Sequence, residues 1–290
     1  MLLARLALGP RPALSRCCAR AASSTPSSSR WKQRQGRDKY ARDAKVLALK
    51  SRAAFKLLEM DEKYRLFKPN QTVVDLGYAP GSWSQVAVDR TRPHGQVVGI
   101  DLIPAQPPRG VATFQGDFRS PTVQRLVKEF VLRMRRPPAP QEPPASQDDA
   151  DEHGGAHELP LDASVDQPSY IDRERHLGES TPDAPAADSP LVDLLLSDML
   201  MNTSGNAFRD HAGSMDLCIA ALQFASDTLK PGGHFVCKFY QGPEDRAFER
   251  RLKKLFAKVH REKPESSRSE SKENFFVALR RKQGVILEDA

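Results

Sequence analysis

Four short apolar segments of the chain carry an aspartate at or directly after their ends, and this pattern constrains the fold more than any other feature. The segments are 72–76 with Asp75, 96–100 with Asp101, 113–115 with Asp117 and 191–197 with Asp198. Segments with helical spacing lie between most of them, and strands that alternate with helices form a parallel sheet wound on both faces. Because ligands bind beyond the carboxyl ends of such strands, we expect the four aspartates to gather at one site.

The other elements follow from apolar spacing and turn residues. Further strands are predicted at 234–239 and 274–279, and helices at 42–66, 82–88, 121–133, 217–228 and 247–259. The residues therefore predict an α/β fold with six recognisable strands.

Residues 137–190 differ in composition from the rest of the chain. These 54 residues contain ten prolines and thirteen acids against two arginines, a formal charge of −11, whereas the 290-residue chain carries +7 and the other 236 residues carry +18. Such a segment cannot bury enough apolar surface to offset the entropy of ordering it. We predict a disordered acidic insert that divides a single domain into 38–136 and 191–283, with a tail at 284–290. A small acidic subdomain is the alternative, although only Tyr170 and Ile171 hint at the apolar period it needs.

The first 37 residues contain eight basic residues and no acid, with leucines interleaved among the first arginines. This composition is typical of a mitochondrial transit peptide and predicts a matrix protein; a basic RNA-binding arm is the alternative. No stretch approaches the ~20 apolar residues that span a bilayer, which excludes an integral membrane protein. Four cysteines in 290 residues are too few for a disulfide scaffold, and the absence of a C-x-x-C pair argues against a zinc ribbon or a redox motif.

The turn after the first predicted strand is suited to a nucleoside. Gly77 and Gly81 remove side chains where the backbone must approach a ligand closely. Asp101 lies 24 residues beyond Gly77, where an acid accepts hydrogen bonds from ribose hydroxyls. NAD enzymes also place an acid there, but this turn lacks G-x-G-x-x-G, and Pro80 cannot donate a backbone hydrogen bond to a pyrophosphate. An NAD-dependent oxidoreductase is therefore the weaker reading.

The segment from Val74 to Gln85, VDLGYAPGSWSQ, resembles the S-adenosylmethionine motif of the FtsJ/RrmJ family of 2′-O-ribose methyltransferases. Further segments match in the family's order: 51–57 before this motif, and after it 115–118, 197–199, 229–233, 237–238 and 263–264 through 271–273. The resemblance spans about 42–281 and is interrupted by the acidic insert. It implies a Rossmann-like, S-adenosylmethionine-dependent methyltransferase with a mostly parallel seven-stranded sheet and helices on both faces.

The resemblance also implies which residues form the site. The methyl donor would be held by Asp75, Gly77, Pro80, Gly81, Ser82, Trp83, Asp101, Asp117, Phe118 and Asp198, with Asp101 on the ribose and Asp117 near the adenine. The catalytic set would be Lys56, Asp198, Lys238 and Glu273, with no metal. Two departures stand out: Tyr78 replaces a small residue, which predicts a narrower cofactor pocket, and Leu200-Met201 replaces Ala-Pro beside the target ribose. Met199 and Met201 are interpreted as packing residues.

The chemistry needs alignment and a base, because a ribose 2′-hydroxyl is a poor nucleophile until it loses its proton. Lys238 is the predicted general base, since burial and a nearby cation such as Lys56 both disfavour the charged form of a lysine. Asp198 would orient the amine and favour the sulfonium, and Glu273 would fix one of the lysines. Taken singly, Lys56 and Glu273 are better explained as solvated charges. Lys238 interrupts an apolar strand, where an unpaired lysine is costly.

Basic residues are concentrated at 30–52 and 246–282, and such surfaces attract phosphate. Together with the family resemblance and the transit-like start, they predict a monomer that methylates a uridine in mitochondrial large-subunit rRNA or in a large ribosomal subunit precursor. The alternative is a large-subunit assembly factor in which RNA binding matters more than methylation.

Overall fold

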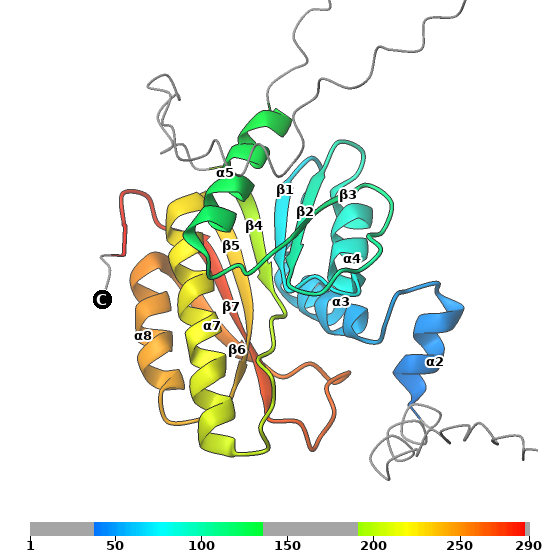
Figure 1. The fold of residues 1–290 in the computed structure, drawn as a ribbon, viewed down its shortest axis with the longest axis vertical. Helices are drawn as coiled ribbons and strands as arrows, with labels where there is room; N and C mark the ends of the chain where they lie inside the picture. Colours follow the sequence, from blue (N-terminus) through cyan, green and yellow to red (C-terminus); the bar gives the residue numbers. More distant parts are fainter. Residues whose placement is uncertain (1–37, 136–190, 288–290) are drawn as a thin grey trace, which may run out of the picture.

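The computed structural model describes residues 38–135 and 191–287, which form one seven-stranded sheet with helices on both faces (Figure 1). The strands are β1 (Thr72–Leu76), β2 (Gln96–Asp101), β3 (Val111–Gln115), β4 (Val192–Ser197), β5 (Leu229–Tyr240), β6 (Phe256–Glu262) and β7 (Glu273–Arg281). The helices are α2 (Lys39–Val46), α3 (Ala53–Tyr64), α4 (Ser82–Thr91), α5 (Pro121–Arg135), α7 (Ala207–Thr228) and α8 (Asp245–Leu255). The predicted transit peptide and acidic insert lie outside the described residues.

The strand order is β3-β2-β1-β4-β5-β7-β6. Strands β1 to β5 pair in parallel, whereas β7 runs antiparallel to both β5 and β6. The chain winds outward from β1 through β2 to β3 and then returns to β4 on the other side of β1. This reversal places the topological switch point, where open α/β sheets bind ligands, between the carboxyl ends of β1 and β4.

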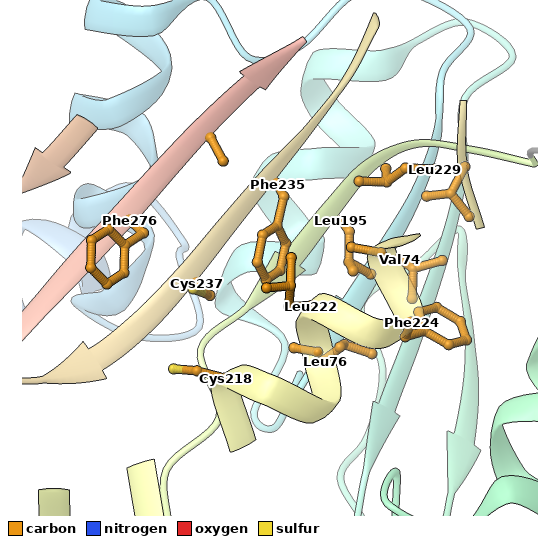
Figure 2. Packing of buried hydrophobic residues seen from close by; sticks show 14 of the residues in the cluster. Val74, Leu76, Leu195, Cys218, Leu222, Phe224, Leu229, Phe235, Cys237 and Phe276 are labelled. Carbon is orange, nitrogen blue, oxygen red and sulfur yellow. The ribbon is translucent and has the colours of Figure 1, made fainter. Parts of the chain in front are cut away.

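Alternate residues of each strand pack on opposite faces of the sheet. Val74 and Leu195 face the layer formed by α5, α7 and α8, whereas Val73 and Leu194 face α3 and α4. Figure 2 shows the first of these layers, with Leu222 of α7 close to the sheet. Both faces of the central strands are buried, as parallel sheets require. The mostly parallel seven-stranded sheet implied by the family resemblance is therefore confirmed.

The predicted helix over 42–66 is wrong in its continuity, because the structure contains α2 and α3 separated by residues 47–52. Ala48 adopts a positive φ of 53°, which ends the first helix, and the Ser51 hydroxyl accepts a hydrogen bond from Ala53 N as the second begins. Val46 and Leu49 continue the helical spacing through this break, so the sequence pattern gave no sign of it. Val46 is in fact 83% exposed.

The predicted helix over 247–259 is also wrong at its end. The helix α8 stops at Leu255, and the next seven residues form β6 on the outer edge of β7, with Phe256 opposite Arg281 and Val259 opposite Ala278. Phe256 and Val259 fit a helical period as well as a strand. Their conformation is decided by β7, a partner more than a dozen residues further along the chain.

In residues 38–135 and 191–287, no helix combines the length and the apolar character needed to cross a membrane.

Candidate active site

A cavity of about 440 Å³ opens at the carboxyl edge of the sheet, beside the switch point. Its walls come from the ends of four parallel strands and from one side of α7. The lining residues are Gly77, Ala79, Ile100 to Ile103, Gly116 to Arg119, Asp198 to Asn202, Gly213, Asp216 and Leu217. The cavity lies within the size range of small-molecule and cofactor sites.

Gly77 allows the turn after β1 to pass directly against the segment after β4. It has a φ of +75°, and a Cβ atom at this position would lie 2.8 Å from Met199 Cγ and 2.9 Å from Met199 Cα. Its backbone N–H donates to Ile100 O at 2.8 Å, which ties the turn to β2. Any other residue would push the walls of the cavity apart.

Asp101, the last residue of β2, joins two walls of the cavity. Its Oδ2 accepts a hydrogen bond from Ala79 N at 2.9 Å, and its Oδ1 accepts one from Ile103 N at 2.9 Å. A carboxylate oxygen has two lone pairs, so both oxygens retain acceptor capacity. The arrangement suits the binding of neighbouring hydroxyl groups.

Asp117 lines the cavity beside Arg119, a residue that the sequence reasoning did not single out. The guanidinium donates to the Asp117 carboxylate at 3.0 and 3.2 Å. These hydrogen bonds, together with one from Arg119 N, hold the pKa of Asp117 below its ordinary value. Both side chains are more than 40% exposed, so the pair borders solvent. Phe118 also lines the cavity and packs edge-on against Phe224, with ring centroids 5.2 Å apart.

The other residues predicted to hold the donor do not line the cavity; they support the turn between β1 and α4. The Trp83 indole donates to Ala53 O at 2.9 Å and packs on Phe275, and the Ser82 hydroxyl lies 2.7 Å from the Ser51 hydroxyl. Gly81 begins α4 with a φ of 103°, next to Pro80, which is exposed.

Asp75 is fully buried beneath the same turn. Its Oδ2 accepts a hydrogen bond from the Ser84 hydroxyl at 2.6 Å, and its Oδ1 has no hydrogen-bond partner among the described residues. Burial is the main cause that raises the pKa of Asp75 to about 7; the Ser84 hydrogen bond opposes it and the charge of Asp198 adds to it. Asp75 therefore lies in the protein core behind the cavity and does not line it.

Tyr78 also lies outside the cavity lining. It is 5% exposed, its ring packs on the bare Cα of Gly99, and its hydroxyl donates to Ala105 O at 2.7 Å. The ring is accommodated because a Cβ on Gly99 would lie 2.7 Å from Tyr78 Cγ. The tyrosine thus anchors the segment after β2 from outside the cavity.

The four side chains predicted to be catalytic form two ion pairs. The Lys56 ammonium of α3 donates to Glu273 Oε1 at 2.6 Å, at the start of β7. The Lys238 ammonium lies 2.9 Å from Asp198 Oδ1 and donates a hydrogen bond to the Asp198 carbonyl oxygen at 2.6 Å. Asp198 lines the cavity, so this pair stands at its wall.

The two ion pairs are electrostatically connected through Glu273. Burial raises the pKa of this carboxyl, but the charge and hydrogen bond of Lys56 and the charge of Lys238 outweigh burial and lower it. Lys238 lies opposite Phe275 on β7, and the Lys56 ammonium lies 5.7 Å from the centre of the Phe275 ring. The Lys238 side chain is only 8% exposed. A lysine this buried needs the partners that Asp198 supplies.

Apolar side chains that the sequence reasoning assigned to packing or did not mention also line the cavity. Met199 and Met201 belong to its wall, as do Leu102 and Ile103, which are more than 60% exposed. The sequence carried a signal for these residues, because Leu102 and Ile103, like Met199 and Met201, lie within three positions after a strand-end aspartate. In the described parts of the chain, the histidine, cysteine and acidic residues form no group able to hold a metal ion.

Comparison with known proteins places this geometry in a family. A profile of FtsJ-like methyltransferases matches residues 49–281. The chain is 36% identical to rRNA methyltransferase 2, mitochondrial, of Saccharomyces cerevisiae, covering 89% of each chain. It is also 36% identical to the ribosomal RNA large subunit methyltransferase E of Zymomonas mobilis, covering 88% of this chain and 89% of that protein.

A crystal structure of a ribosomal RNA methyltransferase from Plasmodium falciparum shares the fold, with a TM-score of 0.53 at 24% identity over 80% of this chain and 97% of that chain. The profile match and the two relatives carry the assignment: the chain belongs to the FtsJ-like methyltransferase family.

Proposed function

We propose that the protein transfers a methyl group from S-adenosylmethionine to the 2′-hydroxyl of a uridine in mitochondrial large-subunit rRNA. The observation that carries this proposal is the position of Asp198. It lines the cavity, and its carboxylate lies 2.9 Å from the buried Lys238 ammonium. A cofactor pocket and a candidate base therefore share one residue.

The residues that line the cavity fit the proposed methyl donor. Asp101 offers two acceptor oxygens to ribose hydroxyls, the apolar side chains after β2 and β4 suit an adenine ring, and Asp117 can accept from its amino group. Asp198 adds negative charge, which favours a sulfonium cation. When bound, the donor supplies a methyl group already activated by the positive charge on sulfur.

The side chains of the two ion pairs then have separate tasks. Lys238, in its neutral form, accepts the proton of the 2′-hydroxyl as the oxygen attacks. Asp198 holds the lysine amine through its carbonyl oxygen and carboxylate. Lys56 supplies a second positive charge, and Glu273 keeps that charge in place at 2.6 Å. General base catalysis of this kind contributes typically ~10²- to 10⁴-fold, and positioning supplies a large part of the remainder.

The RNA substrate and the compartment are inferred from the relatives and from the charge of the chain. The relatives in Saccharomyces cerevisiae and Schizosaccharomyces pombe are both named mitochondrial rRNA methyltransferases, the second at 36% identity over 87% of this chain. The first 37 residues have the composition of a transit peptide. Outside the acidic insert the chain carries +18, which favours contact with phosphate.

The proposal is tested by mapping 2′-O-methyl groups in mitochondrial rRNA from cells with and without the protein. We expect one uridine of the large-subunit rRNA to lose its methyl group, and the purified protein with S-adenosylmethionine to restore it on rRNA or on isolated large-subunit precursors. An unchanged map together with no transfer in vitro would overturn the proposal. Restoration of ribosome assembly by a methylation-deficient Lys238→Ala variant would assign the essential role to RNA binding instead.

A further inference from the structure

We propose that His211, Ser214 and Cys218 of α7 are positioning residues that fix the end of β5 on which Lys238 stands. The inference rests on the proposed role of Lys238. The three residues are spaced by three and four positions, so they share one face of the helix. All three are buried, with exposed fractions of 3%, 6% and 1%. We call these three residues the α7 polar stripe.

The α7 polar stripe makes four contacts with the backbone at and beyond Lys238. The Cys218 thiol donates to Lys238 O at 3.2 Å, and Tyr240 N donates to the Ser214 hydroxyl at 3.0 Å. His211 Nδ1 lies 2.8 Å from Tyr240 O, and Glu244 N donates to His211 Nε2 at 3.1 Å. Because Nε2 accepts from an N–H group, it carries no proton, and the proton of the neutral ring is on Nδ1, where it is donated to Tyr240 O.

The sheet explains why these backbone groups need side-chain partners. The pairing of β4 with β5 ends at Ser197 opposite Cys237, whereas the pairing of β5 with β7 continues to Tyr240 opposite Glu273. From Lys238 onward, no strand of the described residues lies beside the edge of β5 that faced β4. Buried backbone groups without partners are costly, and the stripe supplies the partners that β4 does not.

The next turns of the same helix show the contrast. In the turns directly beyond Cys218, the buried face of α7 is apolar, with Ala221, Leu222 and Ala225 packed where β4 and β5 are paired. Figure 2 shows the apolar part of this face, with Cys218 near Cys237 of β5 and Leu222 further along α7. Two polar residues are also buried at the far end of α7, but the Thr228 hydroxyl donates to Phe224 O within the helix and the Ser226 hydroxyl accepts from Leu287 N. The contacts with the unpaired end of β5 therefore come from the stripe.

His211 also shapes the turn that follows β5. A Cβ atom on Gly242 would lie 2.3 Å from His211 Cγ, so the turn rests directly on the imidazole ring. The ring is therefore held between Tyr240 O, Glu244 N and the Gly242 backbone, two to six residues beyond Lys238. Because misplacement of a catalytic group by about 1 Å can cost ~10²-fold in rate, we expect the stripe to influence turnover without contacting substrate.

The test measures kcat, the dissociation constant of S-adenosylmethionine and the hydrogen exchange of the Tyr240 and Glu244 amides in three variants. His211→Leu removes both imidazole contacts. His211→Asn retains a donor near the position of Nδ1, and serves if the leucine variant does not fold. Leu222→Ala is the matched control, because it also damages the buried face of α7 but lies away from the end of β5.

We expect His211→Leu to lower kcat about tenfold or more and to speed exchange of both amides, while donor affinity stays within about twofold. His211→Asn should recover most of kcat and slow the Tyr240 exchange again. Leu222→Ala should lower stability and leave kcat, measured on folded protein, within about twofold.

Wild-type kcat in folded His211→Leu, or an equal loss of kcat in Leu222→Ala, would overturn the positioning role. If Lys238→Ala retains full turnover, the proposed role of Lys238 itself fails, whereas the exchange data still report whether the stripe holds β5.

Discussion

The two halves of the candidate site are built in different ways. The donor half, formed by Gly77, Asp101 and Asp117, comes from the ends of neighbouring strands within about 40 positions of sequence, and much of its structure is backbone contact. The catalytic half joins Lys56 of α3 to Glu273, 217 positions away at the start of β7, and Asp198 to Lys238, through ion pairs between side chains. The donor half is formed by turns that each directly follow one strand. The catalytic half forms only when α3, β4, β5 and β7 have come together.

This difference separates binding from chemistry. Removal of a side chain from the donor half should weaken the binding of the methyl donor, whereas removal of Lys56, Lys238 or Glu273 should slow the chemical step. Asp198 lines the cavity and also contacts Lys238, so it belongs to both halves. A mutation that lowers kcat without changing affinity has removed an interaction made in the transition state. A single variant that changes the wrong quantity, either kcat for the donor half or donor affinity for the catalytic half, would therefore contradict this separation.

The largest expected effect is that of Lys238→Ala. Loss of the proposed base should lower kcat by ~10²- to 10⁴-fold, because general base catalysis contributes about this much. Donor affinity, measured by calorimetric titration, should stay within about twofold, since Lys238 is not a cavity-lining residue. Methyl transfer to large-subunit rRNA at saturating donor is the kinetic measurement.

Asp101→Ala is the counterpart in the donor half. It removes the carboxylate oxygens that accept hydrogen bonds from Ala79 N and Ile103 N. We expect weaker donor binding, with kcat at saturating donor largely retained. If Lys238→Ala weakens donor binding as much as Asp101→Ala does, the division into two halves is wrong.

The same contrast explains which parts of the fold and site were predictable. The turn from Gly77 to Gly81 and the strand-end aspartates form local patterns, so their gathering at one edge of a parallel sheet followed from sequence. Local spacing could not reveal the break at 47–52 or the strand β6, because both fit a helical period. The Gln85 side chain of α4 accepts from Lys50 N and donates to Ala48 O within the break, and β6 pairs with β7.

The catalytic half was predictable only through resemblance to a family. The residues themselves did not show which lysine Glu273 holds; the structure shows that it is Lys56. The four contacts between α7 and the end of β5 left no sequence signal either, since histidine, serine and cysteine on one helix face are compatible with many environments.

The next prediction concerns Asp75 and Glu273, two carboxyls whose pKa values are shifted in opposite directions. Asp75 in the donor half is buried without a cation, and its pKa is raised from 3.8 to about 7, mainly by burial. Between these values the folded state holds a proton that the unfolded state has lost, so stability falls as pH rises from about 4 to 7. The total change is roughly 4 kcal/mol, taking 1.36 kcal/mol for each pKa unit.

Asp75→Asn should abolish this fall, because the amide cannot ionise and its oxygen can still accept from the Ser84 hydroxyl. The measurement is the free energy of unfolding in urea at several pH values for both proteins. Glu273→Gln is the contrasting variant: the pKa of Glu273 is lowered, so its contribution to stability is present above pH ~4.5 and is lost as pH falls. A difference between wild type and Asp75→Asn that does not change with pH would contradict the assignment.

The smallest expected effect tests whether the donor half depends on more than its lining residues. The Tyr78 hydroxyl donates to Ala105 O at 2.7 Å and anchors the segment after β2, which carries Leu102 and Ile103 on the cavity wall. Tyr78→Phe keeps the ring on Gly99 and removes only this hydrogen bond, whose net contribution is about 1 kcal/mol. Donor affinity should therefore fall by about fivefold, with kcat unchanged.

Tyr64→Phe is the matched control, because its hydroxyl makes a hydrogen bond to Glu262 Oε2 at 2.6 Å and it is not among the residues that line the cavity. The two variants lose the same chemical group, so a similar loss of donor affinity in both would show that the effect is general destabilisation. A loss confined to Tyr78→Phe would show that the tyrosine tunes the pocket through the segment behind it. A residue that departs from its family's small side chain would then have gained a supporting role without entering the cavity.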